Sequence, residues 1–93
     1  MDTVIVSRHE AAIRFTRSDP RFAEAPVLAQ ASAEEVEGKA VAGNLPLHLA
    51  CLCAEYYAIE LPQIAYEKRG TQLSAEEMEA AGARMQRYVV RRA

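Results

Sequence analysis

Short apolar segments alternate with helix-start signatures along this chain, and that alternation constrains the fold more than any other feature. Residues 3–6 (TVIV) form a β-branched run that is typical of a buried strand. Ser7 and Glu10 follow with the spacing of a capping box, in which a serine and a glutamate three residues later close the first helical turn. The pattern predicts a helix over residues 8–17. Pro20 should end it, because the residue before a proline avoids helical geometry.

The same alternation continues through the rest of the chain. Capping boxes recur at Ser32 and Ser74. Pro46 is suited to the first turn of another helix, which the apolar run after it predicts to be largely buried. Residues 88–90 fit either a strand or the last turn of a helix, and the strand is favoured. The remaining expected elements are strands at 25–30, 39–43 and 56–61, one helical turn after Ser32, and helices at 47–54 and from Ser74 to Met85 or Gln86.

Strands that alternate with helices are typical of an α/β domain with a mostly parallel sheet. We therefore expect a compact Rossmann-like fold, with a sheet of four to five strands and flanking helices. The length of 93 residues predicts a single domain over residues 1–93 with only modest stability of its own. A homodimer would supply additional buried area.

The charge pattern excludes several classes of partner. The net charge of −2 divides into +1 over residues 1–21, −6 over 22–67 and +3 over 68–93. Such a chain is poorly suited to long nucleic acid, but a few arginines can still hold a compact anion. No apolar run approaches the ~20 residues of a membrane helix, and the first residues lack the basic segment of a signal peptide. We therefore expect a cytoplasmic protein with no membrane partner.

The sequence also predicts no metal site and no cofactor. Cys51 and Cys53 are too close together for a disulfide framework, and no other thiol could complete a zinc site. We interpret them as buried thiols that act as small apolar residues. The chain contains no dinucleotide-binding, Walker, zinc-protease or nucleophile-elbow motif.

Candidate binding residues follow two of the expected strands. Ser7, Arg8 and His9 come directly after the first strand, and Asn44 and His48 follow the third. Ligands of open parallel sheets bind beyond the carboxyl ends of the strands, where helix N-termini offer free N–H groups and a partial positive charge. If these two strands are neighbours, the five side chains converge at one edge.

Each candidate also has a purely structural explanation. Ser7 and Asn44 could be only helix caps or turn residues, and the two histidines could be incidental. Arg8 is harder to dismiss, because a cation in a first helical turn opposes the helix dipole and so suggests an anionic partner. A second group of residues could form a loop over a phosphate or simply a solvated loop: Lys68, Arg69 and Gly70.

Several short motifs extend over nearly the whole chain in a characteristic order. Residues 4–13 (VIVSRHEAAI) resemble a V-S-R-H-x-G-A-I opening, and residues 43–50 (GNLPLHLA) resemble G-x-L-P-x-H-L-A. The closing half is matched by Leu61-Pro62, Arg69-Gly70-x-x-Leu73-Ser74 and Met78-x-x-x-Gly82-Ala83-Arg84. Together they resemble a small CRISPR-associated family, Csx-sixteen. Three departures from its pattern are Glu10, Ala11 and a shortened segment at 54–56.

The resemblance implies an accessory protein of type III CRISPR systems, which signal with cyclic oligoadenylates. It implies a CARF-like homodimer that acts as a ring nuclease, above all on cyclic tetra-adenylate, and so switches the antiviral response off. The ribose 2′-OH would attack the adjacent phosphate without a metal. Arg8 and Arg69 are then candidates for charge stabilisation, and His9 or His48 for proton transfer. The candidate substrate-binding residues are Ser7, Asn44, Leu45, Pro46, Lys68 and Gly70.

Two other functions fit the same residues. A binding module of the same fold could sequester or sense the cyclic nucleotide without cutting it. Alternatively, the chain could be a structural or partner-binding α/β protein whose capped helices have no ligand.

Overall fold

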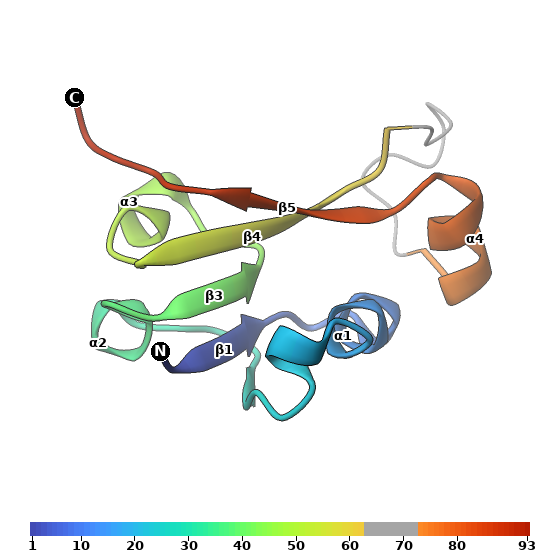
Figure 1. Ribbon diagram of the computed structural model, residues 1–93, viewed down its shortest axis with the longest axis horizontal. Helices are drawn as coiled ribbons and strands as arrows, with labels where there is room; N and C mark the ends of the chain where they lie inside the picture. Colours follow the sequence, from blue (N-terminus) through green and yellow to red (C-terminus); the bar gives the residue numbers. More distant parts are fainter. Residues whose placement is uncertain (63–72) are drawn as a thin grey trace.

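A twisted sheet forms the centre of the computed structural model, which describes residues 1–62 and 73–93 (Figure 1). Within these residues the sheet has five strands in the order β2-β1-β3-β4-β5. The first four run parallel, and β5 is antiparallel to β4. The predicted α/β class with a mostly parallel sheet is confirmed. The strands are β1 (Thr3–Val6), β2 (Val27–Leu28), β3 (Ala40–Gly43), β4 (Glu55–Glu60) and β5 (Arg84–Tyr88).

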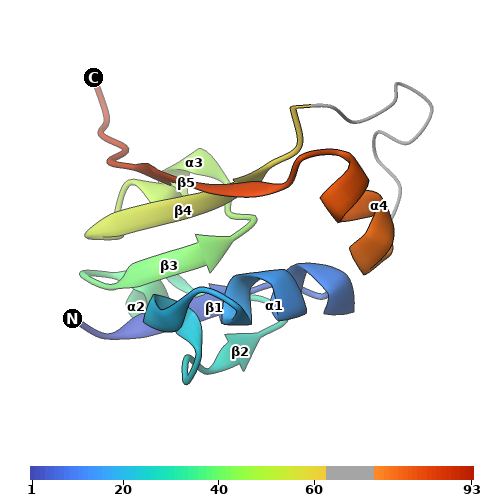
Figure 2. The ribbon, with the colours of Figure 1, turned by 45° about the vertical axis from the view of Figure 1, so that its right-hand side comes forward.

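Helices cover both faces of this sheet, and each face has its own apolar core (Figures 1 and 2). Alternate residues of a strand point to opposite faces. On β1, Val4 and Val6 therefore join one core and Ile5 joins the other. Phe22 packs on the face that includes Ile5, and Val36 packs on the opposite face. The helical elements are α1 (Glu10–Arg17), the 3-10 turn η1 (Pro20–Phe22), α2 (Ala33–Val36), α3 (Leu47–Ala50) and α4 (Ala75–Ala80).

Several elements lie where the sequence predicts them. The first strand has the expected bounds of residues 3–6, and the weak second strand is reduced to two residues. Ser32 begins a one-turn helix as expected, with its N–H donating to the carboxylate of Glu35 at 2.8 Å. Ser74 caps α4 by accepting a hydrogen bond from the Glu77 N–H at 3.1 Å.

Three predicted helices differ from the observed ones. The helix predicted from residue 8 begins at Glu10. The helix predicted over 47–54 ends at Ala50 and is not largely buried, since Leu47 is 74% exposed. The helix predicted to reach residue 85 ends at Ala80, because Gly82 adopts a positive φ of 74° that turns the chain into β5. A last strand is present, but it spans Arg84–Tyr88 and therefore ends where the strand predicted over residues 88–90 begins.

Candidate functional site

The carboxyl ends of β1 and β3 lie side by side, as the candidate site requires. Val6 and Gly43 are register partners in the parallel pair. The N–H of Asn44 donates to the carbonyl of Val6 at 3.2 Å, so the segments after the two strands start next to each other. The first and third predicted strands are therefore neighbours in the sheet, as convergence of the candidate side chains requires.

Gly43 makes this close approach possible. Its φ of 137° is a conformation that residues with a side chain rarely adopt. A Cβ at this position would lie 1.9 Å from the carbonyl oxygen of Val6. The end of β3 can therefore contact β1 so closely only with glycine at this position.

Ser7 shapes the loop between β1 and α1 but does not cap the helix. Its Oγ accepts a hydrogen bond from the N–H of His9 at 3.1 Å, which is a local turn rather than a capping box. His9 is the residue that precedes the helix, and its side chain makes no capping bond. The prediction of a capping box at Ser7 was wrong. The Ser7 hydroxyl bonds the N–H of His9 rather than that of Glu10, and the Glu10 carboxylate pairs with Arg14 at 3.6 Å.

Arg8 and His9 are presented to solvent by this turn. Both are exposed, and neither side chain has a hydrogen-bond or ion-pair partner among the residues that the structure describes. The loop is fixed through its backbone, since the N–H of Ser7 donates to the carbonyl of Leu28 at 3.0 Å. A cation and an imidazole are thus held at the carboxyl edge on a backbone of defined position.

Tyr56 supports the second loop and was not identified from the sequence. Its hydroxyl donates to the carbonyl of Gly43 at 2.6 Å and accepts from the N–H of Leu45 at 3.0 Å. Burial raises the pKa of this phenol, so it remains a neutral donor and acceptor. The only sequence signal was an aromatic residue in a strand, which is ordinarily a packing residue.

The loop after β3 carries the other candidates to different places. Asn44 is exposed beside the end of β1, whereas the side chain of Leu45 is buried in a core. Pro46, which was predicted in the first turn of a helix, is exposed and directly precedes α3, which begins at Leu47.

His48 lies on a segment that runs back along the sheet. After α3 the carbonyl of Leu52 accepts a hydrogen bond from the N–H of Gly38 at 3.0 Å, which is close to the start of β3. Figure 1 shows α3 on the side of the sheet where β4 begins, away from the arrowheads of β1 and β3. The structure therefore brings Ser7 and Asn44 together and carries His48 away from them.

The remaining candidates contribute little to this edge. Lys68, Arg69 and Gly70 lie outside the described residues. Cys51 and Cys53 are partly rather than fully buried free thiols, and burial raises the pKa of Cys53. Within residues 1–62 and 73–93, no three side chains of metal-ligating type gather into a possible ion site. In the same residues no helix is long and apolar enough to cross a bilayer.

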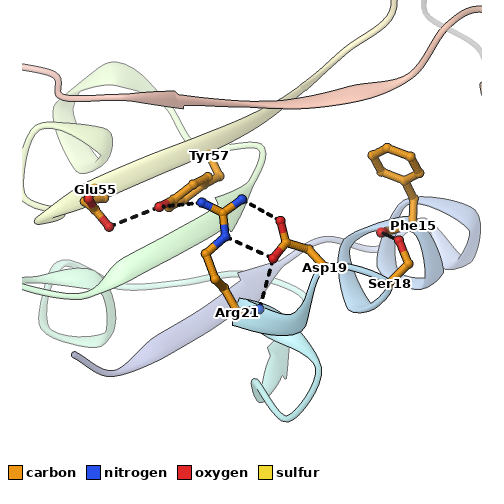
Figure 3. Close-up of polar contacts among 6 residues, drawn as sticks. All are labelled: Phe15, Ser18, Asp19, Arg21, Glu55 and Tyr57. Carbon is orange, nitrogen blue, oxygen red and sulfur yellow. Dashed lines mark hydrogen bonds and ion pairs between the residues drawn. The ribbon is translucent and has the colours of Figure 1, made fainter.

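A second polar group, the Arg21 cluster, was also missed from the sequence (Figure 3). We define it as Asp19, Arg21, Glu55 and Tyr57, which Figure 3 draws, together with Arg87 of β5. Arg21 donates to Asp19 at 2.9 Å and to the hydroxyl of Tyr57 at 3.1 Å, with its guanidinium 4.5 Å from the centre of the tyrosine ring. The hydroxyl in turn donates to Glu55 at 3.1 Å, and Arg87 donates to Glu55 at 3.0 Å. The bond from Arg21 lowers the pKa of Asp19.

Comparison with known families places the chain. Residues 4–91 match the model of a family described as "Putative CRISPR-associated protein (Cas_VVA1548)". The chain belongs to this CRISPR-associated family. The matched range includes both loops at the carboxyl edge and all of the sheet except Thr3. Searches of curated proteins and of solved structures returned no match.

Proposed function

We propose that this CRISPR-associated protein is a ring nuclease that binds and linearises a cyclic oligoadenylate, above all cyclic tetra-adenylate, and so switches off type III CRISPR signalling. The Csx-sixteen-like motifs suggest this activity, and membership of a CRISPR-associated family agrees with that setting. The observation that carries the proposal is the exposure of Arg8 and His9, without side-chain partners in the described residues, at the carboxyl edge of a parallel sheet.

The electrostatics of the β1–α1 loop favour a phosphate. Arg8 lies just before the eight-residue helix α1, whose free N–H groups carry a partial positive charge. The guanidinium and the helix dipole therefore act on an anion in the same sense, while they repel each other in its absence. A guanidinium also matches a phosphate geometrically, because it donates two parallel hydrogen bonds.

The proposed reaction needs little from the protein beyond positioning and charge. The ribose 2′-oxygen forms a bond to phosphorus as the bond from phosphorus to the 5′-oxygen breaks, which leaves a 2′,3′-cyclic phosphate and a 5′-hydroxyl. The nucleophile belongs to the substrate, so no metal-activated water is required. His9 would accept the 2′-OH proton, and a protonated group would supply one to the 5′-oxygen. Arg8 would stabilise the charge that develops on the non-bridging oxygens.

A homodimer would present this set of residues twice. The two-fold symmetry of a dimer matches that of a cyclic tetranucleotide, so equivalent loops could hold opposite phosphates. Arg69 and Lys68, which follow β4 in sequence, remain candidates for further phosphate contacts.

The alternative is a module that binds the cyclic nucleotide without cutting it. The position of His48 favours this alternative, because it leaves His9 as the one histidine at the carboxyl edge among the described residues. A single imidazole would have to serve both proton transfers or share them with solvent.

The test is incubation of purified protein in excess over radiolabelled cyclic tetra-adenylate, in EDTA, with separation of the products. Linear species that end in a 2′,3′-cyclic phosphate are the expected result. An intact ring that co-elutes with the protein would favour the binding module. An intact ring that does not bind would overturn both functions.

A further inference from the structure

A cavity lies between α1 and α4, at the end of the sheet that carries the proposed phosphate site. Its volume is about 400 Å³, within the range of small-molecule pockets. Figure 2 shows the first turn of α1 lying against α4 at the same end of the sheet as the arrowheads of β1 and β3. Ala11, which lines the cavity, is in the first turn of α1, and this helix begins directly after Arg8 and His9. A ligand whose phosphate contacts Arg8 and His9 can therefore extend into this space.

The lining of the cavity has the composition of a site for a flat, aromatic group. Phe15 lies one helical turn after Ala11 and on the same side of α1, so both face the cavity. Figure 3 shows the Phe15 ring projecting from α1 away from Asp19 and Arg21. Met78 from α4 lines the cavity as well. Phenylalanine rings and methionine sulfur both contact aromatic rings favourably.

Polar groups among the lining residues could recognise the edge of a base. Arg14 and Glu79 come from different helices and carry opposite charges. The side chains of the Arg14–Glu10 pair, 3.6 Å apart, are 75% and 81% exposed, so the guanidinium can leave this pair at little cost. A guanidinium can donate to ring nitrogens, and a carboxylate can accept from an exocyclic amine. Adenine offers both kinds of partner.

We propose that the α1–α4 cavity is the adenine-binding subsite of this protein. The inference rests on the proposed function for its ligand, since it takes one base of a bound cyclic oligoadenylate. The base stacks on Phe15 and contacts Met78, while its phosphate lies at Arg8 and His9. This arrangement would give the site a preference for adenylates, which phosphate contacts alone cannot provide.

Three methionines make the subsite directly observable. With ¹³C-methyl methionine the spectrum contains signals only from Met1, Met78 and Met85. Met78 lines the cavity, whereas Met1 is 77% exposed at the chain start and Met85 is on β5. Saturating adenosine 5′-monophosphate should shift the Met78 signal through the ring current of the base. Ribose 5-phosphate, which lacks the base, should not.

Phe15→Leu tests the stacking contact while it preserves an apolar side chain. It should weaken adenosine 5′-monophosphate binding about 10-fold, since stacking of a base on an aromatic residue contributes at that level. Thermal unfolding verifies that the variant folds. Glu79→Gln should also weaken binding. Glu76→Gln is its matched control, because Glu76 is on the same helix but is exposed and absent from the lining.

The outcomes separate this subsite from the proposed function. If the ring is bound or cleaved while Met78 does not respond to the base, the subsite is wrong and the function stands. If adenosine 5′-monophosphate shifts Met78 but no ring is cleaved, the subsite stands and the nuclease is wrong. An equal response of Met78 to ribose 5-phosphate would also overturn the subsite.

Discussion

Two polar regions of this protein are built in opposite ways. At the carboxyl edge, backbone bonds together with the hydroxyls of Ser7 and Tyr56 hold the β1–α1 and β3–α3 loops in place, whereas the side chains of Arg8 and His9 have no hydrogen-bond or ion-pair partners in the described chain. In the Arg21 cluster, side chains make the contacts, and every charged group is paired with another. The first region therefore holds unpaired side chains on a fixed backbone, whereas in the second region the charged side chains pair with one another.

This difference separates residues that bind from residues that hold the fold together. An exposed charge that is already paired must lose its partner before it can bind a ligand, and such pairs contribute only ~0–1 kcal/mol to stability. An unpaired cation at the edge of a parallel sheet has no such competitor. The comparison therefore predicts that substitutions at the two regions affect different measurements.

The largest expected effect comes from the backbone of the carboxyl edge. Gly43→Ala places a Cβ 1.9 Å from the carbonyl oxygen of Val6, in a conformation that alanine rarely adopts. Because two strands would have to separate, we expect a loss of more than about 4 kcal/mol, enough to abolish cooperative folding of so small a domain. Thermal unfolding followed by circular dichroism measures this.

Gly38→Ala is the matched control. Gly38 also has a positive φ, of 71°, but a Cβ there would meet nothing within 4 Å. Only the conformational strain remains, at about 1–2 kcal/mol. If the two variants lose the same stability, the close approach of β3 to β1 does not determine the cost at Gly43.

The second effect is on activity alone. Arg8→Ala removes the proposed donor to the scissile phosphate and should slow cleavage of cyclic tetra-adenylate about 100-fold, the usual loss for one donor to a developing oxyanion. The melting temperature should not fall, because the side chain makes no hydrogen bond or ion pair within the described residues. Arg17→Ala is the control, since Arg17 is on α1 but donates to the carbonyl of Ala23. Unchanged cleavage in Arg8→Ala would rule out this site.

The third effect compares two neighbouring tyrosines of β4 that face opposite sides of the sheet. Tyr56→Phe leaves the carbonyl of Gly43 and the N–H of Leu45 without their partner, which should cost ~1–3 kcal/mol. Tyr57→Phe loses bonds only to the half-exposed Arg21 and to Glu55, and should cost under ~1 kcal/mol. Urea unfolding at constant m-value compares them. Equal losses would mean that Tyr56 does not support the loop.

The sequence predicted the elements of the fold well because its strand signals are local. The β-branched run at 3–6 and the capping boxes at Ser32 and Ser74 led directly to observed elements. Helix lengths were predicted less well. The helices predicted over 47–54 and from Ser74 to residue 85 or 86 end at Ala50 and Ala80, where the chain turns toward the next strand. Gly82 is a helix-ending residue, but the apolar spacing that continues to Met85 led the prediction past it.

Only those features of the candidate site that depend on neighbouring residues in the sequence and on strand order were predicted. The adjacency of Ser7 and Asn44 followed from strand order, which the structure confirms. The bonds of the Tyr56 hydroxyl and the bond from Arg21 to Tyr57 join residues more than ten positions apart, so no local pattern could indicate them. The return of the chain after Gly43, which moves His48 away from this edge, is likewise a tertiary feature.

The smallest expected effect is the pH dependence that arises within the Arg21 cluster. Asp19 accepts bonds from the side chain and backbone N–H of Arg21, which hold its folded-state pKa below the usual value near ~3.9. A lowered folded-state pKa contributes stability that is present above ~pH 4 and is lost as the pH falls through the folded-state value. Asp19→Asn keeps a side-chain acceptor at this cap but removes the charge.

The stability difference between wild type and Asp19→Asn should therefore be largest at neutral pH and shrink below ~pH 4. It should stay under ~1 kcal/mol, because the side chain of Arg21 is 52% exposed and solvent screens the pair. Urea unfolding at several pH values measures it. In an Arg21→Gln background the same aspartate substitution should show a smaller pH dependence, since the partner charge is gone and only the bond from the backbone N–H at position 21 still lowers the Asp19 pKa. A pH dependence that is undiminished there would mean that the charges of this cluster do not act as a pair, and the contrast with the open carboxyl edge would then lose its electrostatic basis.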